Sequence, residues 1–121
     1  MAQLFNQREQ GLTMDGLWTT EFGSSTGIFG GGVAVFRDGK ILGGDATYYY
    51  IGEYTLTGNA FKATLRISPF IEGAESVFKT VGRDLTLDLE GSLTSKDQAI
   101  AQGHPRGTPG LNFGAKLTRR A

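Results

Sequence analysis

An Asp-Gly pair between two short apolar runs is the feature that most constrains what this chain can fold into. Asp38-Gly39 separates the apolar residues 33–36 from Ile41-Leu42. A type I′ turn needs positive φ at both central residues, and Asp-Gly tolerates that conformation, so the pair predicts a β-hairpin. Glycines at both ends of the hairpin, at 30–32 and 43–44, are expected where strands bend or backbones approach closely. The turn sets a register with Phe36 opposite Ile41 and Val35 opposite Leu42.

A second hairpin is predicted at Gly58-Asn59, between the apolar-rich segments 48–56 and 61–67. A slip of one residue would move charged side chains such as Glu53 and Lys62 to the apolar face, so the register is strongly specified. A two-residue turn pairs residues of one apolar face: Leu56 with Phe61, Tyr54 with Ala63, Gly52 with Leu65 and Tyr50 with Ile67.

Alternation of apolar and polar residues also predicts strands at 17–22, 84–94, 99–103 and 111–118. Seven or eight strands, mostly joined by short turns, favour an all-β fold, namely a small up-and-down antiparallel β-barrel of about eight strands. Residues 70–83 break the alternation, and either one short helix near 72–82 or a bridging loop is expected there. The nineteen glycines fit turns and bends of such a fold.

The chain is expected to form a single β-barrel domain over residues 14–121. Residues 1–13 are rich in Gln and precede the β-pattern, so they are predicted to be a flexible N-terminal extension. Met14 stands directly before that pattern, which also raises the hypothesis of a misassigned start. The last residues, Arg119-Arg120-Ala121, are predicted to be solvated.

Composition excludes several classes of function. The chain has no cysteine, which excludes disulfides and thiol chemistry and leaves zinc without its usual sulfur ligands. Twelve basic and twelve acidic residues give a net charge of zero, which argues against direct nucleic-acid binding. No stretch has the roughly 18 apolar residues that a membrane-spanning helix needs. We therefore expect no membrane partner and a cytoplasmic location.

Catalytic machinery is not evident. His104 is the only histidine and is predicted to lie in a surface loop, so no acid–base pair, metal site or cofactor is expected and the chain is not predicted to be an enzyme. The glycine-rich segment 23–32 lacks the Gly-Lys-Ser/Thr ending and following helix of a phosphate loop. Asp45 is expected to cap a local turn, with lining of a site as the alternative.

Two groups of side chains are candidates for binding. The first faces the predicted interior and forms either a packed core or the wall of an apolar ligand cavity. Its members are Trp18, Phe22, Tyr50, Tyr54, Phe61, Leu65, Leu87 and Phe113. The second lies on the other face of the sheet, where exposed apolar residues are typical of protein interfaces. Its members are Val33, Val35, Leu42 and Tyr49.

Several segments resemble the GrlR family, small bacterial proteins named after a negative regulator of type III secretion genes. The similarity is strongest in Asp15-Gly16-Leu17-Trp18, in Gly32-Val33-Ala34-Val35 and in the hairpin containing Asp38, Gly39, Gly43, Gly44 and Asp45. The resemblance implies a lipocalin-like barrel, often dimeric, whose named member binds a transcriptional activator without catalysis. That member's acidic surface run corresponds here to Leu56-Thr57-Gly58-Asn59, which has no acidic residue.

Two functions are therefore predicted. The first is a bacterial, non-enzymatic regulatory protein that acts through protein–protein contacts, as a homodimer, with a transcriptional activator as a further partner. The alternative is a lipocalin-like carrier of a small apolar ligand in the barrel interior.

Overall fold

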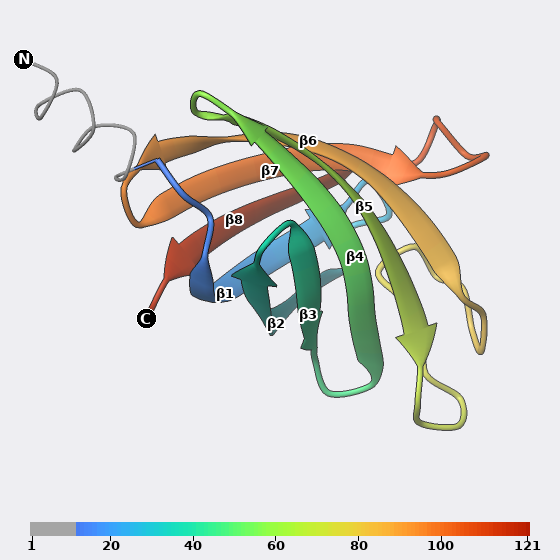
Figure 1. Cartoon of the computed structure of the whole chain (residues 1–121). Coiled ribbons are helices and arrows are strands. Elements are labelled where there is room, and N and C mark those ends of the chain that lie inside the picture. The colour runs from blue at the N-terminus through green and yellow to red at the C-terminus, as the bar shows by residue number, and fades with distance from the viewer. Residues whose placement is uncertain (1–11) are drawn as a thin grey trace, which may run out of the picture.

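The computed structural model describes residues 12–121, which form a closed barrel of eight antiparallel strands (Figure 1). Each strand pairs with the next, and the last pairs with the first, so the predicted all-β, up-and-down barrel is confirmed. The strands are β1 (Gly16–Ser24), β2 (Phe29–Arg37), β3 (Lys40–Gly44), β4 (Tyr48–Thr57), β5 (Ala60–Pro69), β6 (Leu85–Ser95), β7 (Gln98–Pro105) and β8 (Phe113–Arg119).

Both predicted hairpin registers are confirmed. Val35 pairs with Leu42 and Phe36 with Ile41 across β2 and β3, while all four predicted pairs occur across β4 and β5. Asp38 and Gly39 have φ values of 49° and 81°, as a type I′ turn requires. At the second turn Gly58 has φ of 61°, which fits the first central position of a type II′ turn.

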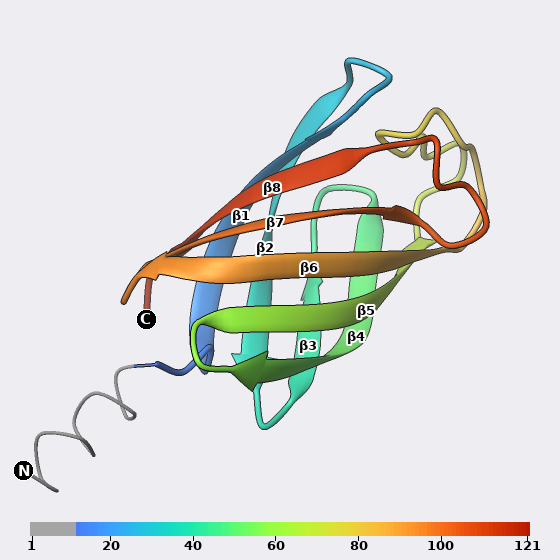
Figure 2. The same cartoon turned by 90° about the horizontal axis from the view of Figure 1, so that it is seen from above.

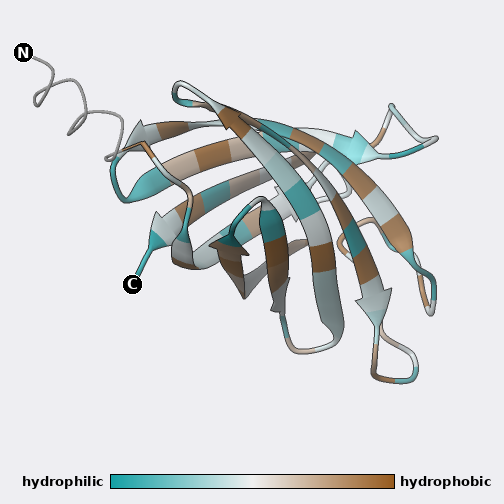
Figure 3. Ribbon diagram, in the orientation of Figure 1, coloured by the Kyte–Doolittle hydropathy of each residue, from teal (hydrophilic) through white to brown (hydrophobic). Residues whose placement is uncertain are grey.

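Apolar and polar residues alternate along β6, as its hydropathy colours show in Figure 3, and buried or half-buried residues alternate with exposed ones along β4. In β6, Leu87, Leu89 and Leu93 are buried, whereas Glu90 and Thr94 are exposed. Because successive side chains of a strand point to opposite faces, one face of every strand lies inside the barrel.

The two ends of the barrel carry different connections (Figure 2). The β1–β2, β3–β4, β5–β6 and β7–β8 connections lie at one end, which we call the open end. The remaining hairpin turns and the C-terminus lie at the other, which we call the closed end. Of the predicted extension 1–13, residues 1–11 lie outside the described part of the chain.

The prediction of a short helix near 72–82 is wrong, since no helix occurs within residues 12–121. The 70–84 loop is instead an irregular connection, with an isolated bridge between Glu75 and Val81. Gly73 and Gly82 have φ values of 78° and 66°, outside the right-handed helical region. The Ser76 Oγ accepts hydrogen bonds from the Phe78 and Thr80 amides, which replaces helical bonding with a side-chain turn.

Two smaller expectations also need correction. His104 lies within β7, opposite Asp88, and not in a loop. The Arg119 side chain is only 11% exposed, so the C-terminal segment is not simply solvated. The described residues contain no helix of the length and hydropathy needed to span a membrane.

Candidate functional site

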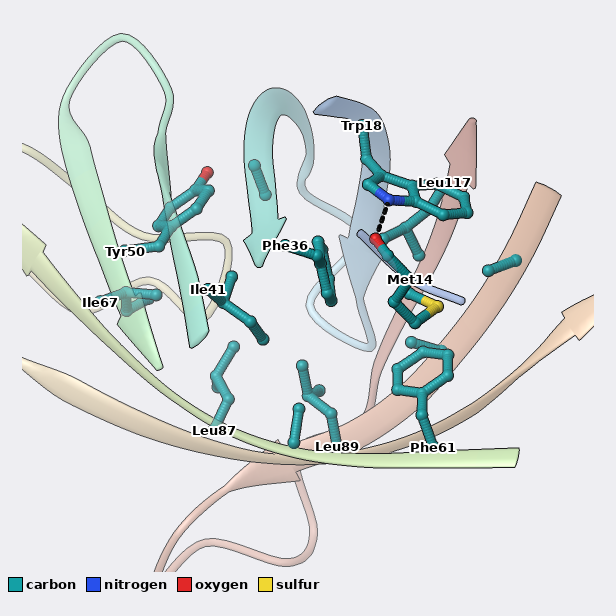
Figure 4. Close-up of a cluster of buried hydrophobic side chains, with 14 of the residues drawn as sticks. Met14, Trp18, Phe36, Ile41, Tyr50, Phe61, Ile67, Leu87, Leu89 and Leu117 are labelled. Atoms are coloured by element: carbon teal, nitrogen blue, oxygen red, sulfur yellow. Dashed lines mark hydrogen bonds between the residues drawn. The ribbon is translucent and has the colours of Figure 1, made fainter. Parts of the chain in front are cut away.

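The closed end is sealed by Met14 and Trp18, which are both 0% exposed. The Trp18 Nε1–H donates to the Met14 carbonyl oxygen at 2.8 Å (Figure 4). The Arg119 guanidinium lies 4.6 Å from the centre of the indole ring, a cation–π distance, and donates to the carbonyl oxygens of Thr13 and Lys96 at 2.5 and 2.8 Å. Carbonyl oxygens of the segment before β1 and of the β6–β7 turn thus accept the hydrogen bonds of Trp18 and Arg119 at this end.

Tyr54 belongs to the same end. Its ring packs edge-on against Phe36 at 5.2 Å, and its hydroxyl donates to Asp15 Oδ1 at 3.0 Å. Burial, followed by the hydrogen bond to Asp15, raises the pKa of Tyr54 to about 12. Asp15 Oδ1 also accepts from the Asp38 amide, so the β2–β3 turn is attached to the segment that precedes β1.

A cavity of about 340 Å³ lies between the closed-end residues and the open end. Its volume is within the range of about 300–1,000 Å³ that is typical of small-molecule sites. Most of its wall is aromatic or aliphatic. Six of the eight predicted wall residues line it, namely Phe22, Tyr50, Phe61, Leu65, Leu87 and Phe113. Trp18 and Tyr54 do not line it and instead help to close the opposite end.

One polar pair faces this cavity. The Tyr50 hydroxyl donates to Asp45 Oδ2, while Asp45 Oδ1 accepts from the amides of Thr47 and Tyr48 at 3.0 and 2.8 Å. Asp45 therefore caps the β3–β4 turn and lines the site, which joins the two alternatives predicted for it. Burial first, and the bond to Asp45 second, hold the pKa of Tyr50 far above its usual value.

The glycines of β2 make space for this pair. A Cβ at Gly32 would lie 2.8 Å from the Tyr50 hydroxyl oxygen and 3.3 Å from Asp45 Cβ. A Cβ at Gly30 would lie 2.7 Å from the ring of Phe22. These distances are shorter than ordinary contacts, so the glycine-rich segment is needed for the side chains that line the open end.

The 70–84 loop covers the open end of the cavity. The Val77 carbonyl oxygen accepts from the Ser24 hydroxyl and, at 2.5 Å, from Thr26 Oγ1. The Tyr48 hydroxyl is within hydrogen-bond distance of the carbonyl oxygens of Ala74 and Thr80, at 3.2 and 3.3 Å. Side chains of the barrel thus hold the loop across its mouth.

The side chain of Phe78 extends from the loop into the cavity, which it helps to line. It is 4% exposed, and its ring lies 5.9 Å from that of Phe113, which in turn stacks at 5.8 Å on Phe22. Sequence reasoning placed no functional residue in the loop. The Ser and Thr residues that hold the loop are not regularly spaced, so no sequence pattern predicts their role.

The outer face of β1–β4 carries a second candidate site. Strand pairing aligns Leu17, Val35, Leu42 and Ile51 in one row. Their side chains are 38%, 42%, 57% and 43% exposed. All four predicted interface residues are exposed here: Val33, Val35, Leu42 and Tyr49. We call these six residues, with Leu17 and Ile51 included, the outer apolar face. Leu17 and Ile51 were not among the predicted interface residues, although strand pairing places Leu17 beside Val35 and Ile51 beside Leu42.

Comparisons with known proteins identify no family. No family model and no curated protein matches the chain. Among solved structures, a redesigned β-barrel is similar over 89% of this chain and 92% of its own, with a TM-score of 0.49 and 14% sequence identity. Within residues 12–121, no group of three or more His, Cys, Asp or Glu side chains is arranged to hold a metal ion.

Proposed function

We propose that this barrel binds a small apolar molecule in its interior and acts without catalysis. The observation that carries the proposal is the covered cavity of about 340 Å³, whose wall is aromatic and aliphatic with few polar groups. Burying an apolar ligand there releases about 25 cal/mol per Å² of apolar surface removed from water. The 70–84 loop supplies a cover that a ligand would have to displace on entry.

Native mass spectrometry of the protein, purified from a bacterial host under gentle conditions, tests the proposal. A bound species that dissociates on collisional activation is expected. Ala63→Phe should abolish its retention, because Ala63 lines the cavity and the added ring would occupy it. Thr64→Phe is the matched control, since the neighbouring side chain is exposed on the outside. Equal retention by both variants would count against interior binding.

The outer apolar face supports a second candidate function, contact with another protein. Six exposed apolar side chains on adjacent strands are more than the scattered single residues of an ordinary surface. The resemblance to the GrlR family leads us to propose a homodimer, with a transcriptional activator as a further partner.

Analytical ultracentrifugation at micromolar concentration tests the homodimer. We expect a dimer that Leu42→Glu converts to a monomer, because a charge would be buried in an apolar interface. Thr64→Glu, on the outer surface of β5, is the matched control and should leave the dimer intact. A monomeric unmodified protein would exclude the homodimer, and a pull-down from the native bacterium would then test the activator alone.

A further inference from the structure

The ionisable groups that line the cavity are unevenly distributed. Asp45 and Glu75 both line its open end, whereas no Lys, Arg or His of residues 12–121 does so. Tyr48 also lines the cavity, and after burial the charges of both carboxylates add to the rise of its pKa. The whole chain has equal numbers of acidic and basic residues, so this local excess of negative charge is a property of the site.

Hydrogen bonding at the pair adds a second constraint. Asp45 accepts three bonds, two from amides and one from Tyr50, which leaves about one of its roughly four acceptor positions free. The Tyr50 proton is directed at Asp45, so the hydroxyl oxygen can only accept further bonds. A ligand group that reaches this pair must therefore donate a hydrogen bond.

Aromatic rings surround the same end of the cavity. Phe22, Tyr48, Phe78 and Phe113 all line the cavity, as Asp45 does. The faces of such rings attract cations, and more strongly where water is excluded. Aromatic walls, two carboxylates and the absence of a described cationic side chain together match a group that is both cationic and a donor.

We propose that the ligand is a small hydrophobic amine, bound as its ammonium ion with the N–H groups toward Asp45 and Tyr50 and its apolar body in the cavity. The inference rests on the proposed ligand-binding function. A carboxylate ligand would meet two like charges with no lining cation among residues 12–121, and it has no proton to donate. A neutral hydrocarbon would take water from Asp45 without replacing its hydrogen bond.

Three probes of nearly equal shape test the inference by isothermal titration calorimetry: 1-naphthylmethylamine, 1-naphthalenemethanol and 1-naphthoate. The amine should bind at least about tenfold more tightly than the alcohol, as a hydrogen bond between charged groups allows. The naphthoate should show no measurable binding. Binding of the uncharged alcohol measures the affinity of the apolar cavity, so it tests the proposed function independently of the amine.

Asp45→Asn should reduce the affinity for the amine about tenfold or more and the affinity for the alcohol by a smaller factor, because the alcohol donates its hydrogen bond without carrying a charge. The amide can still accept the turn bonds, and circular dichroism melting checks the fold. Glu75→Gln is a second variant, and a smaller loss is expected because Glu75 is exposed at the mouth. Asp84→Asn is the matched control, since Asp84 is exposed in the same loop and does not line the cavity.

The outcomes separate the two claims. Equal affinity for all three probes, or tightest binding of the alcohol or the naphthoate, overturns the amine while ligand binding stands. A preference for the amine that persists in both Asp45→Asn and Glu75→Gln also overturns it. Failure of all three probes to bind overturns the amine and counts against the proposed function as well.

Discussion

The two ends of the barrel each contain a tyrosine whose hydroxyl donates to an aspartate, yet the two pairs have different surroundings. Tyr54 and Asp15 lie at the closed end, where Asp15 also binds the β2–β3 turn. Tyr50 and Asp45 lie at the open end and face a cavity. The tyrosine–aspartate hydrogen bond therefore holds chain segments together at the closed end, whereas at the open end it leaves free acceptor positions facing the cavity.

The packing of side chains also differs between the two ends. At the closed end Met14 and Trp18 are fully buried and belong to the hydrophobic core cluster (Figure 4). At the open end glycines 30 and 32 replace side chains, and a loop without regular structure forms the cover. We infer that the closed end contributes most of the stability and that the open end is adapted to binding.

The largest expected effect comes from Trp18→Ala. Removing the indole leaves a cavity at the closed end and frees the Met14 carbonyl oxygen, and such truncations cost about 3–5 kcal/mol. Urea unfolding followed by far-UV circular dichroism measures the loss. Trp18→Phe should lose less because a ring remains. Stability unchanged in Trp18→Ala would contradict the assignment of stability to this end.

Arg119→Met is expected to come next. The guanidinium donates to the carbonyl oxygens of Thr13 and Lys96 and also pairs with Asp97. Hydrogen bonds of a charged group are worth about 1.5–3 kcal/mol. Methionine keeps much of the apolar length over Trp18. Arg120→Met is the control, because among residues 12–121 the Arg120 side chain donates to the Thr19 hydroxyl alone, in an exposed bond. The same urea titration gives both values, and equal losses would contradict the role assigned to Arg119.

Gly32→Ala tests the open end. The new Cβ would lie 2.8 Å from both the Tyr50 hydroxyl and the Gly44 carbonyl oxygen, so the pair must move, at a cost of about 1–3 kcal/mol. Retention of ligand in native mass spectrometry should fall as well. Gly31→Ala is the matched control, since the nearest atom to its Cβ would be 3.4 Å away. If the Gly32→Ala variant still retains ligand, the Tyr50–Asp45 pair does not contribute to ligand binding.

The smallest effect concerns alkaline pH. The pKa of Tyr54 rises from 10.0 to about 12 in the folded chain, and the pKa of Tyr50 rises further. Above pH 10 the folded state then holds more protons than the unfolded state, so stability falls as pH rises. Tyr54→Phe and Tyr50→Phe should each flatten this fall, and Tyr50→Phe should flatten it more. Urea unfolding below pH 10 and near pH 12 measures the slopes, and parallel slopes in all three proteins would contradict the assignment.

Local chemistry explains how much could be predicted from the sequence. The Asp38-Gly39 pair predicts the turn conformation, and the alternation along 48–67 predicts which face of the sheet each side chain occupies. The strands and registers of these hairpins could therefore be predicted. Val33, Val35, Leu42 and Tyr49 were placed outside by the same alternation. In this fold, the strand period also separates cavity-facing side chains from exposed ones.

The closed end and the loop cover depend on contacts between residues far apart in the sequence, which no local pattern predicts. Met14 precedes the first strand, and Arg119 donates to the carbonyl oxygen of the neighbouring Thr13, which lies 106 residues earlier in the chain. The 70–84 loop is held by Ser24, Thr26 and Tyr48 through hydrogen bonds to its carbonyl groups, whose positions only the closed barrel defines. The preference of Tyr50 for Asp45 likewise depends on the space that Gly32 leaves.

Closure of the barrel has a consequence for how the chain is made. The Leu17 amide donates to the carbonyl oxygen of Ala121 at 2.8 Å, and β1 pairs along its length with β8. During synthesis the first strand therefore leaves the ribosome long before its second neighbour exists. Such distant pairing slows folding, and an unpaired strand edge invites association with other nascent chains. The second edge of β1 thus stays unpaired until β8 has been synthesised.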